Sequence, residues 1–419
     1  MAATPCGSVR RNNKKTFAGG WLISLEDEIK KRKDVELHVA YLSVVAENFF
    51  EYDGVNYYPI VVPLHRNPII RIMSRARNET HKEKFIEPQL KRVINEVRPD
   101  IIHVHGTEGL LGICSSFTIG VPLVFSIQGL IAPYAEKYFS GIPQHFALKN
   151  DLFYDMIRNS GIKHNFRSFL YRAEREKKYL QKAQYIFGRT YWDKQITGLC
   201  NPERKYYIVN EIMRPQFYQK KWVKTAFNER LQIVSTISGG IYKGYETALR
   251  AAKLLKDYAL FEFDWHIVGY DNTSKWVHIA EKLTGLKSSN CNIVFHGRLD
   301  ADNLSDLLVK SDIYVHVSHI ENSPNSVCEA MLVGMPVIAS FAGGTNSILE
   351  NGKEGVLLQD GDPYVLSGTV VDYMQNPEKA IQYGNAAMVR ASLRHEKQKI
   401  VEEVVNGYKQ IVQDHKSCK

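Results

Sequence analysis

The sequence has few cysteines, and their spacing does not group them. Six cysteines are scattered through 419 residues, and no two form a CxxC pair. Disulfide frameworks and structural zinc sites need paired or closely spaced cysteines, so neither kind of site is indicated. Scattered thiols suit a reducing compartment, and we expect the protein to be cytoplasmic.

Long apolar runs are missing as well. The longest stretch without a charged residue, 109–135, contains glycine, serine, Pro122 and Gln128. We interpret it as a helix, a turn and a buried strand over 122–127, not as a membrane span. The first residues lack the basic, apolar and small-residue order of a signal peptide. No GxGxxG follows a strand and no GxxxxGK[ST] occurs, which disfavours a Rossmann oxidoreductase and a P-loop enzyme.

Short β-branched runs alternate with helical patterns in both halves of the chain. This alternation is typical of parallel sheets covered by helices on both faces. A chain of 419 residues is long enough for two such domains. We therefore predict an α/β protein with two Rossmann-like, doubly wound parallel-sheet domains that face each other across a cleft. The predicted strands are 35–42, 57–62, 101–105, 122–127 and 185–187 in the first half, and 231–237, 263–268, 292–295, 313–317, 336–340 and 355–358 in the second.

The stretch 211–228 interrupts the alternation with a proline and a mixture of charged and aromatic residues, so we place a linker there. The predicted domains are residues 1–210 and 229–394, and a helix over 395–419 is expected to pack back toward the first domain. A doubly wound domain should open with a buried apolar strand, but Met1–Thr16 is polar and basic. Either the first strand is missing or the first sheet is built differently.

Positive charge is concentrated in the first half. Residues 1–209 hold 31 Lys and Arg against 21 Asp and Glu, a net charge of +10, whereas the whole chain carries +9. The region 149–182 mixes many of these basic residues with phenylalanine and tyrosine. Two interpretations remain open: a face that contacts anionic lipid on the inner side of the membrane, or an amphipathic helix packed on its own domain. No nucleic-acid recognition motif accompanies the charge, so we expect no nucleic-acid partner.

The clearest chemical signal is HIENSPNSVCEAMLVGMPVIAS, residues 319–340. Glu321 follows the predicted strand 313–317, and Glu329 lies in the first turn of a helix expected to begin near Ser326. Ligands of open parallel sheets bind at the carboxyl ends of strands, where helix N-termini offer free N–H groups. A carboxylate placed there can accept both hydroxyls of a ribose. A capping box formed by Ser326 and Glu329 is the alternative explanation.

Glycine-rich turns follow two other predicted strands of the second half. Lys243 and Gly244 end the turn after strand 231–237, and a lysine there can neutralise a diphosphate. Gly343 and Gly344 follow the strand after the glutamates and permit close approach of a ligand. Ordinary turns with a surface lysine would give the same patterns.

The first half offers weaker candidates. Gly19 and Gly20 precede a helical pattern and are candidates to face a phosphate. His103 and His105 lie on one face of the predicted strand 101–105, since side chains alternate along a strand. We expect His105 to reach the ligand and His103 to be a hydrogen-bonded core residue. Gln128 ends the next strand, where its amide can donate to a phosphate or a sugar hydroxyl.

Together these residues resemble a family-four glycosyltransferase of the GT-B fold. ENSPNSVCEAM matches the E-x7-E element of that family, and the match continues through GMPVIAS to Gly343 and Gly344. The motifs YKG (242–244), FHG (295–297) and PDIIHVH (99–105) stand in the family's order. The resemblance is close over 230–375 and looser over 17–215. Ser238 departs from it, because the family often has an arginine there, and Gln128 stands where it often has a histidine.

The resemblance implies roles for the candidates. Glu329 would bind the donor ribose, Glu321 would contact hydroxyls of the donor sugar, and Lys243 would bind the diphosphate. Such enzymes usually retain the anomeric configuration and need no metal or other cofactor. The implied catalytic residues are Glu321, Lys243, His105 and Gln128, and the implied donor-binding residues are Glu329, Asn325, Ser326, Gly19, Gly20, Gly244, Gly297, Arg298, Gly343 and Gly344.

The expected function is therefore hexosyl transfer with retention. The donor would be a nucleotide sugar, with UDP expected over GDP, and the acceptor a saccharide or lipid-linked intermediate of surface polysaccharide biosynthesis. Two rival hypotheses remain. A nucleotide-sugar epimerase of similar fold would interconvert sugars without an acceptor, and a non-catalytic nucleotide-sugar-binding protein would bind the donor without turnover.

Overall fold

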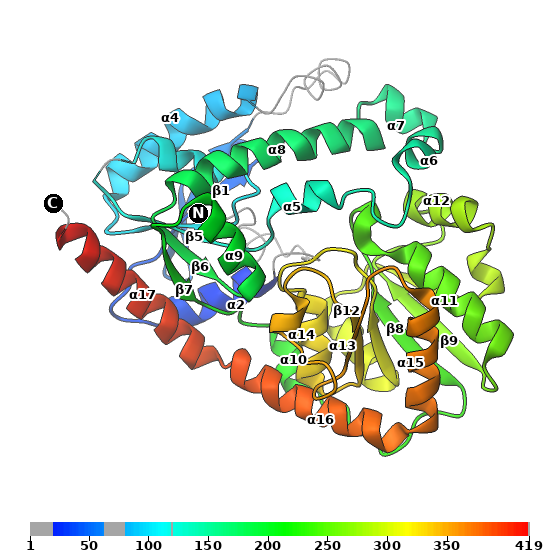
Figure 1. The fold of residues 1–419 in the computed structure, drawn as a ribbon. Coiled ribbons are helices and arrows are strands. Elements are labelled where there is room, and N and C mark those ends of the chain that lie inside the picture. The colour runs from blue at the N-terminus through cyan, green and yellow to red at the C-terminus, as the bar shows by residue number, and fades with distance from the viewer. Residues whose placement is uncertain (1–19, 63–79, 119, 418–419) are drawn as a thin grey trace. The chain divides into compact units, whose positions relative to one another are not determined.

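The computed structural model describes residues 20–62, 80–118 and 120–417, and the chain divides into two compact units (Figure 1). The first unit contains the described residues up to Ala135, Phe153–Ile212 and the chain from Glu396 onward. The second contains Glu136–Leu152 and Met213–His395. Residues 136–152, predicted as part of the first domain, thus cluster with the second unit. The polar segment Met1–Thr16 lies outside the described residues.

The second unit is built on one parallel sheet of six strands in the order β10-β9-β8-β11-β12-β13. The strand order runs outward in both directions from the neighbours β8 and β11, which places the topological switch point between them. Open α/β sheets bind ligands at this point. All six strands were predicted to within two residues at each end. They are β8 (Leu231–Thr236), β9 (Phe263–Val268), β10 (Ile293–Gly297), β11 (Ile313–His316), β12 (Val337–Ser340) and β13 (Val356–Leu358).

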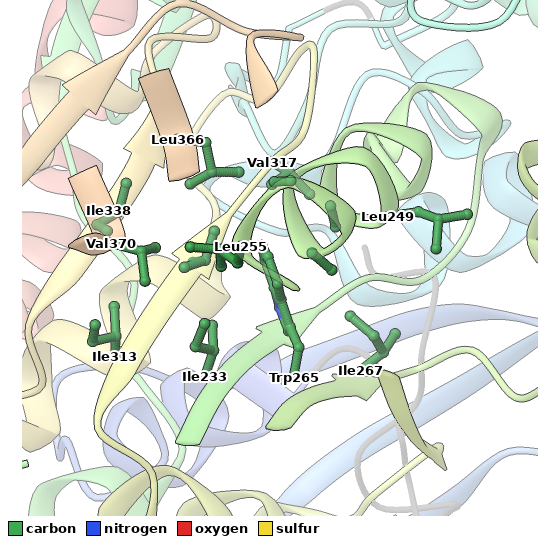
Figure 2. Packing of buried hydrophobic residues seen from close by; sticks show 14 of the residues in the cluster. Ile233, Leu249, Leu255, Trp265, Ile267, Ile313, Val317, Ile338, Leu366 and Val370 are labelled. Carbon is green, nitrogen blue, oxygen red and sulfur yellow. The ribbon is translucent and has the colours of Figure 1, made fainter. Parts of the chain in front are cut away.

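Helices cover both faces of this sheet. Figure 2 shows the apolar side chains, Trp265 among them, that pack between one face and the helices α11 (Tyr245–Tyr258) and α15 (Pro363–Gln375). The indole N–H of Trp265 donates to Ser235 Oγ at 3.0 Å, so this large buried side chain leaves no orphan donor. The other face packs on α10, α13, α14 and α16. The remaining elements of the unit are α6 (Gln144–Lys149), α10 (Pro215–Gln219), η2 (Ile241–Lys243), α12 (Lys275–Thr284), η3 (Ser288–Asn290), α13 (Ala301–Lys310), α14 (Asn325–Val333), η4 (Thr345–Ser347) and α16 (Pro377–Arg394).

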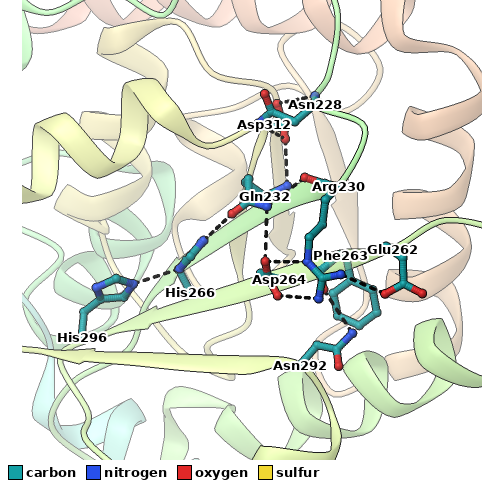
Figure 3. Close-up of polar contacts among 10 residues, drawn as sticks. All are labelled: Asn228, Arg230, Gln232, Glu262, Phe263, Asp264, His266, Asn292, His296 and Asp312. Carbon is teal, nitrogen blue, oxygen red and sulfur yellow. Dashed lines mark hydrogen bonds and ion pairs between the residues drawn. The ribbon is translucent and has the colours of Figure 1, made fainter.

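A polar network ties together the amino ends of the central strands (Figure 3). Asp312 is fully buried just before β11 and accepts hydrogen bonds from the backbone N–H of Gln232 at 2.8 Å and from both the side chain and backbone of Asn228. It also pairs with Lys224 at 2.7 Å. A buried carboxylate needs such partners. The network continues over the sheet through Arg230, Asp264, Gln232, His266 and His296.

The described part of the first unit holds two sheets. Four parallel strands form the order β4-β5-β6-β7, and a three-stranded sheet has the order β1-β3-β2, in which β2 is antiparallel to β3. The sequence did not predict β2 or β7, because one has only three residues and the other is a short polar-ended edge strand. The bounds are β1 (His38–Ser43), β2 (Phe50–Tyr52), β3 (Val55–Val61), β4 (Ile102–His105), β5 (Leu123–Ser126), β6 (Tyr185–Gly188) and β7 (Lys205–Ile208).

The C-terminal helix α17 (Lys397–Ser417) packs within the first unit. Its apolar side chains, such as Val404 and Ile411, share a buried cluster with Trp21 and Leu25 of α2 (Gly20–Ile29) and with Phe187 of β6. An apolar stripe of this kind is what stabilises a surface helix. The other helices of this unit are α4 (Thr80–Val97), η1 (Leu111–Ser116), α5 (Ile131–Glu136), α7 (Phe153–Ile157), α8 (Ile162–Lys182) and α9 (Tyr191–Cys200).

The basic region 149–182 consists largely of α8. This helix buries Ala173, Tyr179 and Leu180 against its own unit, as an amphipathic surface helix does. The short helix α7 before it differs, because Phe153 is 73% exposed and Ile157 58% exposed. Among the described residues, no helix combines the length and apolar character needed to cross a membrane.

Candidate functional site

The candidate site of the second unit lies at the carboxyl ends of β8 and β11, on either side of the switch point. Lys243 ends the short helix η2 after β8, and Glu321 lies in the loop between β11 and α14. Lys243 Nζ donates to Glu321 Oε1 in an ion pair. Ser318 Oγ donates to the same oxygen at 3.2 Å, and His316 Nε2 lies 3.9 Å from it. Two residues that are 78 positions apart are thus brought together as predicted for a shared site.

Electrostatics keep this pair charged. Burial alone would raise the pKa of Glu321, but the charge of Lys243 and the neighbouring His316 outweigh it and lower that pKa to about 2. Burial alone would lower the pKa of Lys243, but the charge of Glu321 raises it. A cation and an anion are therefore held ready at the switch point, where a phosphate and sugar hydroxyls can each find a partner of the right kind.

Two of the predicted glycines are required by close backbone packing around this pair. Gly244 has φ +76°, and a Cβ there would lie 1.9 Å from the carbonyl oxygen of Val317. Gly343 has φ +57°, and its Cβ would lie 1.9 Å from the carbonyl oxygen of Glu321. The N–H of Gly344 donates to that same carbonyl at 2.9 Å. Only glycine allows both the left-handed backbone and the close approach, so these turns hold Glu321 and Lys243 in place.

Glu329 lies inside α14 and is paired. Arg214, just before α10, donates to both carboxylate oxygens of Glu329 at 2.8 Å. Burial raises the pKa of Glu329, and the charge of Arg214 opposes that rise. The capping-box alternative is wrong: α14 begins at Asn325 after the N-cap residue Pro324, and no side chain caps it. The predicted start of this helix, near Ser326, is off by one residue, and Glu329 lies too far along the helix to cap its N-terminus.

Buried polar atoms without a partner mark the same edge. Within the described chain, His316 Nδ1 and Asn325 Oδ1 are buried and make no hydrogen bond. His316 ends β11, and Asn325 opens α14, whose first N–H groups have no intrahelical acceptor. Ser326 follows in the same first turn. Buried polar groups are normally paired, so unpaired ones at a strand end point to a ligand that the protein binds.

Gly297 and Arg298 lie elsewhere on the same sheet edge. Gly297 ends the edge strand β10 with φ +61°, and Arg298 follows it. In the sheet, β9 and β8 stand between β10 and β11. The role of Gly297 and Arg298 in donor binding stays a prediction.

The remaining predicted residues belong to the first unit. His105 ends β4, its Nδ1 is buried without a described partner, and burial lowers its pKa well below the usual value. His103 forms hydrogen bonds with Tyr408 Oη at 2.6 Å and Ser126 Oγ at 2.5 Å, as predicted, although its side chain is only partly buried. The two rings lie 3.9 Å apart, on one face as predicted. Gln128 lies in the loop between β5 and α5, Gly20 opens α2, and Gly19 lies outside the described residues.

Several charged residues near these positions were not predicted. Arg214 and His316 contact the two glutamates, and His319 lies between the carboxylates of Glu246 and Asp360. In the first unit, burial raises the pKa of Glu108, in the loop after β4, to about 7. Placement at or just after a strand end could have indicated His316, His319 and Glu108, whereas Arg214 lies just before α10 and has no such signal.

Comparisons with known proteins show which parts of the chain resemble known families. Residues 218–390 match the family described as "Glycosyl transferases group 1". The amylovoran biosynthesis glycosyltransferase AmsK of Erwinia amylovora is 23% identical over 205 residues, which is 48% of this chain and 49% of that protein. An uncharacterized glycosyltransferase, MJ1069, of Methanocaldococcus jannaschii is 26% identical over 172 residues, 40% of this chain and 42% of that protein. The chain thus aligns with less than half the length of these curated relatives.

Solved structures extend the likeness over nearly the whole chain. The sucrose-phosphate synthase of Thermosynechococcus elongatus superposes with a TM-score of 0.70 at 15% identity, and the match covers 95% of this chain and 94% of that one. The Anabaena protein Alr3699/HepE, solved with UDP and glucose, gives a TM-score of 0.63 at 16% identity, with 95% and 97% covered. The fold is GT-B, with two Rossmann-like domains, as predicted. Residues 218–390 thus match a glycosyltransferase family over less than half of the chain.

Proposed function

We propose that the protein is a metal-independent, retaining glycosyltransferase that moves a hexose from a nucleoside diphosphate sugar to a saccharide or lipid-linked acceptor. The observation that carries the proposal is the partly buried Lys243–Glu321 ion pair at the switch point of the second unit's sheet. The unpartnered atoms of His316 and Asn325 beside it support a polar ligand at that edge. The glycosyltransferase family match over 218–390 supports the reaction class.

The chemistry follows from the charges. The bond between the anomeric carbon and the diphosphate oxygen breaks, and the acceptor oxygen bonds to that carbon from the same face. The acceptor proton passes to the departing diphosphate. Negative charge grows on the diphosphate, and Lys243 together with the free N–H groups at the start of α14 stabilises it. Glu321 holds the sugar hydroxyls, and Glu329 with Arg214 beside it binds the ribose.

The donor and acceptor belong to the proposal as finer points. A UDP sugar is favoured because the similar Anabaena protein was solved with UDP and glucose. Surface polysaccharide biosynthesis is favoured by the similarity to the amylovoran enzyme and to the lipopolysaccharide glucosyltransferase WaaG of Escherichia coli, which is 27% identical over 159 residues. His105 and Gln128 of the first unit are proposed to contact the acceptor or the transferred sugar.

Calorimetric titration with UDP and with GDP in EDTA tests the donor site. We expect UDP to bind to the native chain and to lose at least about tenfold in affinity in Glu329→Ala, because a buried carboxylate that accepts ribose hydroxyls is removed. Glu262→Ala is the matched control, since Glu262 is exposed and pairs with Arg230 at the opposite end of the sheet. If GDP binds and UDP does not, the donor base is guanine rather than uracil.

Turnover separates the proposal from its rivals. With a UDP-hexose panel and an acceptor extract, a transferase releases UDP and forms a glycoside, and nuclear magnetic resonance then reports the anomeric configuration. An epimerase would change the sugar nucleotide without an acceptor. A binding protein would take up nucleotide and release no product. If folded native protein binds neither nucleotide, the donor-site assignment is wrong.

Contact with an anionic membrane is proposed for α7 and α8. Phe153, Tyr154 and Ile157 are exposed on α7, and Lys163 and Arg167 are exposed on α8. Aromatic side chains beside lysine and arginine suit the boundary of an anionic bilayer. Sedimentation with phosphatidylglycerol vesicles should carry the native chain down and leave a Phe153→Ser, Ile157→Ser variant in solution. Equal sedimentation of both would exclude α7 as the contact.

A further inference from the structure

A second charged cluster lies beside the candidate site in the second unit. His319 is buried, and its Nε2 is 2.6 Å from Glu246 Oε1 while its Nδ1 is 3.0 Å from Asp360 Oδ2. Glu246 is buried as well, whereas a quarter of the Asp360 side chain is exposed. His319 opens the stretch 319–340, but neither the roles inferred from the sequence nor the proposed reaction uses it, Glu246 or Asp360.

The imidazole in this cluster is charged. Both ring nitrogens face carboxylate oxygens, and only the imidazolium form has an N–H on each nitrogen. Burial alone would lower the pKa of His319, but hydrogen bonds and attraction from Asp360 and Glu246 raise it to about 9. The buried His319 imidazolium therefore donates a hydrogen bond to each of two carboxylates.

The cluster joins one helix and two loops at the carboxyl edge of the sheet. Glu246 lies in the first turn of α11, directly after the Lys243 loop. Asp360 lies between β13 and α15, and His319 lies in the Glu321 loop. The backbone N–H of His319 also donates to the carbonyl oxygen of Tyr242 at 3.0 Å. A single residue thus fixes the loop that carries Lys243 against the loop that carries Glu321.

Close packing surrounds the cluster, and among the described residues the one other side-chain donor to Glu246 Oε1 is Thr247 Oγ1, at 3.2 Å. A Cβ on Gly141 would lie 2.0 Å from Glu246 Oε1 and 2.5 Å from His319 Nε2, so the backbone of this residue rests directly on the pair. Glu246 Oε2 is buried and makes no hydrogen bond to any described residue. Without the imidazolium, a buried carboxylate would lose its strongest donor, which is costly in a dry site.

We propose that His319 is a positioning residue of the donor site, which as an imidazolium between Glu246 and Asp360 holds Lys243 and Glu321 at the separation that the donor needs. This inference rests on the proposed function. It differs from a purely structural role because the ion pair it orders is the one assigned to the diphosphate and the sugar. Catalytic groups must be held within fractions of an ångström, and small displacements cost rate.

The pH dependence has a definite sign. The folded pKa of about 9 lies above the usual value for histidine, so the contribution of His319 to stability is complete below about pH 6.5 and is lost as the pH rises through 9. Activity should fall over the same upper range. Of the groups nearby, the pKa of Lys243 is raised and that of Glu321 lowered to about 2, so neither changes charge near pH 9. Burial raises the pKa of Tyr138 and of Tyr270, and the hydrogen bond from His319 lowers that of Asp360.

The test compares His319→Gln with Asp312→Asn in the full chain. Asp312 anchors the polar network at the amino ends of the strands (Figure 3), so its variant loses a buried charge of the same unit without touching the candidate site. We would measure UDP affinity by calorimetry and kcat and KM for the UDP-hexose between about pH 6.5 and 9.5. His319→Gln should lower kcat about 10- to 100-fold, with UDP affinity changed less, and should lose the alkaline fall. Asp312→Asn should keep both kcat and the alkaline fall.

A milder variant guards against failure to fold. Asp360→Asn keeps the pair with Glu246 and should shift the alkaline fall to lower pH, because one of the two charges that raise the pKa of His319 is gone. Native-like kcat and an unchanged pH profile in both cluster variants would overturn the positioning role while leaving the proposed function intact. Absence of nucleotide binding and transfer in the native chain would overturn both.

Discussion

Glu321 and Glu329 show how the same side chain takes different properties from its neighbours. Glu321 shares one oxygen with Lys243 and Ser318, and its pKa falls to about 2. Glu329 is clasped by Arg214, yet burial raises its pKa. The first carboxylate is therefore the more firmly ionised, as a group that holds sugar hydroxyls beside a diphosphate-binding lysine should be.

Replacing Glu321 by glutamine should affect both stability and activity. The amide keeps the shape, but Lys243 then lies largely buried without a counter-charge, and we expect about 3 kcal/mol of lost stability. The rate of transfer should fall about 100-fold, because the sugar loses a charged acceptor. Urea unfolding and initial rates measure the two effects.

A double variant provides the control for this prediction. Lys243→Met combined with Glu321→Gln removes both charges, so it should be less destabilised than the two single variants added together. Its activity should stay lost, since the lysine is assigned to the diphosphate. Additive stabilities, or recovery of activity in the double variant, would contradict the assignment of the pair.

Gly343 offers a sharper test, because the chain contains a matched glycine elsewhere. Gly352 has φ +76°, and a Cβ added there would have no atom within 4 Å, whereas a Cβ on Gly343 would strike the carbonyl oxygen of Glu321. Gly352→Ala should cost only the left-handed backbone strain, about 1 kcal/mol. Gly343→Ala should cost more and also weaken UDP binding. Urea unfolding and calorimetry measure both effects, and equal losses in the two variants would mean that Gly343 does not hold Glu321.

At the scale of elements, α14 shows where sequence reasoning succeeded and where it failed. The strands beside it, β11 and β12, were predicted because each is an apolar run that is fully buried. The start of α14 was misassigned because Ser326 and Glu329 fit a capping box, while the chain instead uses Pro324 as N-cap. Local patterns fix elements well, but a cap depends on backbone angles that the pattern does not contain.

The cap assignment has a measurable consequence. Ser326→Ala should change stability by less than about 0.5 kcal/mol, because the hydroxyl caps nothing, yet it should weaken UDP binding. Asp300→Ala is the positive control, since Asp300 accepts from the N–H of Asn303 at 3.0 Å and truly caps α13. That variant should lose about 1 kcal/mol in urea unfolding. An equal loss in Ser326→Ala would restore the capping interpretation.

The candidate site was predicted in part for the same physical reason. Glu321, Lys243 and Gly343 stand next to recognisable strands, so their convergence at one sheet edge follows from the parallel topology. Arg214 and His319 were missed, because their partners come from elements 115 and 73 positions away and no local pattern announces such pairs. Only the packed structure shows which distant charges meet.

At the scale of the whole molecule, the chain passes between its two units four times, after residues 135, 152, 212 and 395. Each unit nevertheless has apolar cores of its own. We therefore expect calorimetric unfolding in two transitions rather than one, since separate cores melt as separate cooperative units. Asp312→Asn should lower the melting temperature of the second unit alone. The transition that moves in this variant is therefore the transition of the second unit.

Nucleotide should then act on one transition alone. All of the proposed UDP contacts with Glu329, Lys243 and the start of α14 belong to the second unit, so UDP at about 100 times its dissociation constant should stabilise that unit by about 2.7 kcal/mol. The melting temperature of the first unit should not change, and Glu329→Ala should abolish the shift of the second unit. An equal upward shift of both transitions would show that nucleotide binding also depends on residues of the first unit, such as His105. A shift of the first transition only would move the donor site to that unit and contradict the assignment made for the Lys243–Glu321 pair.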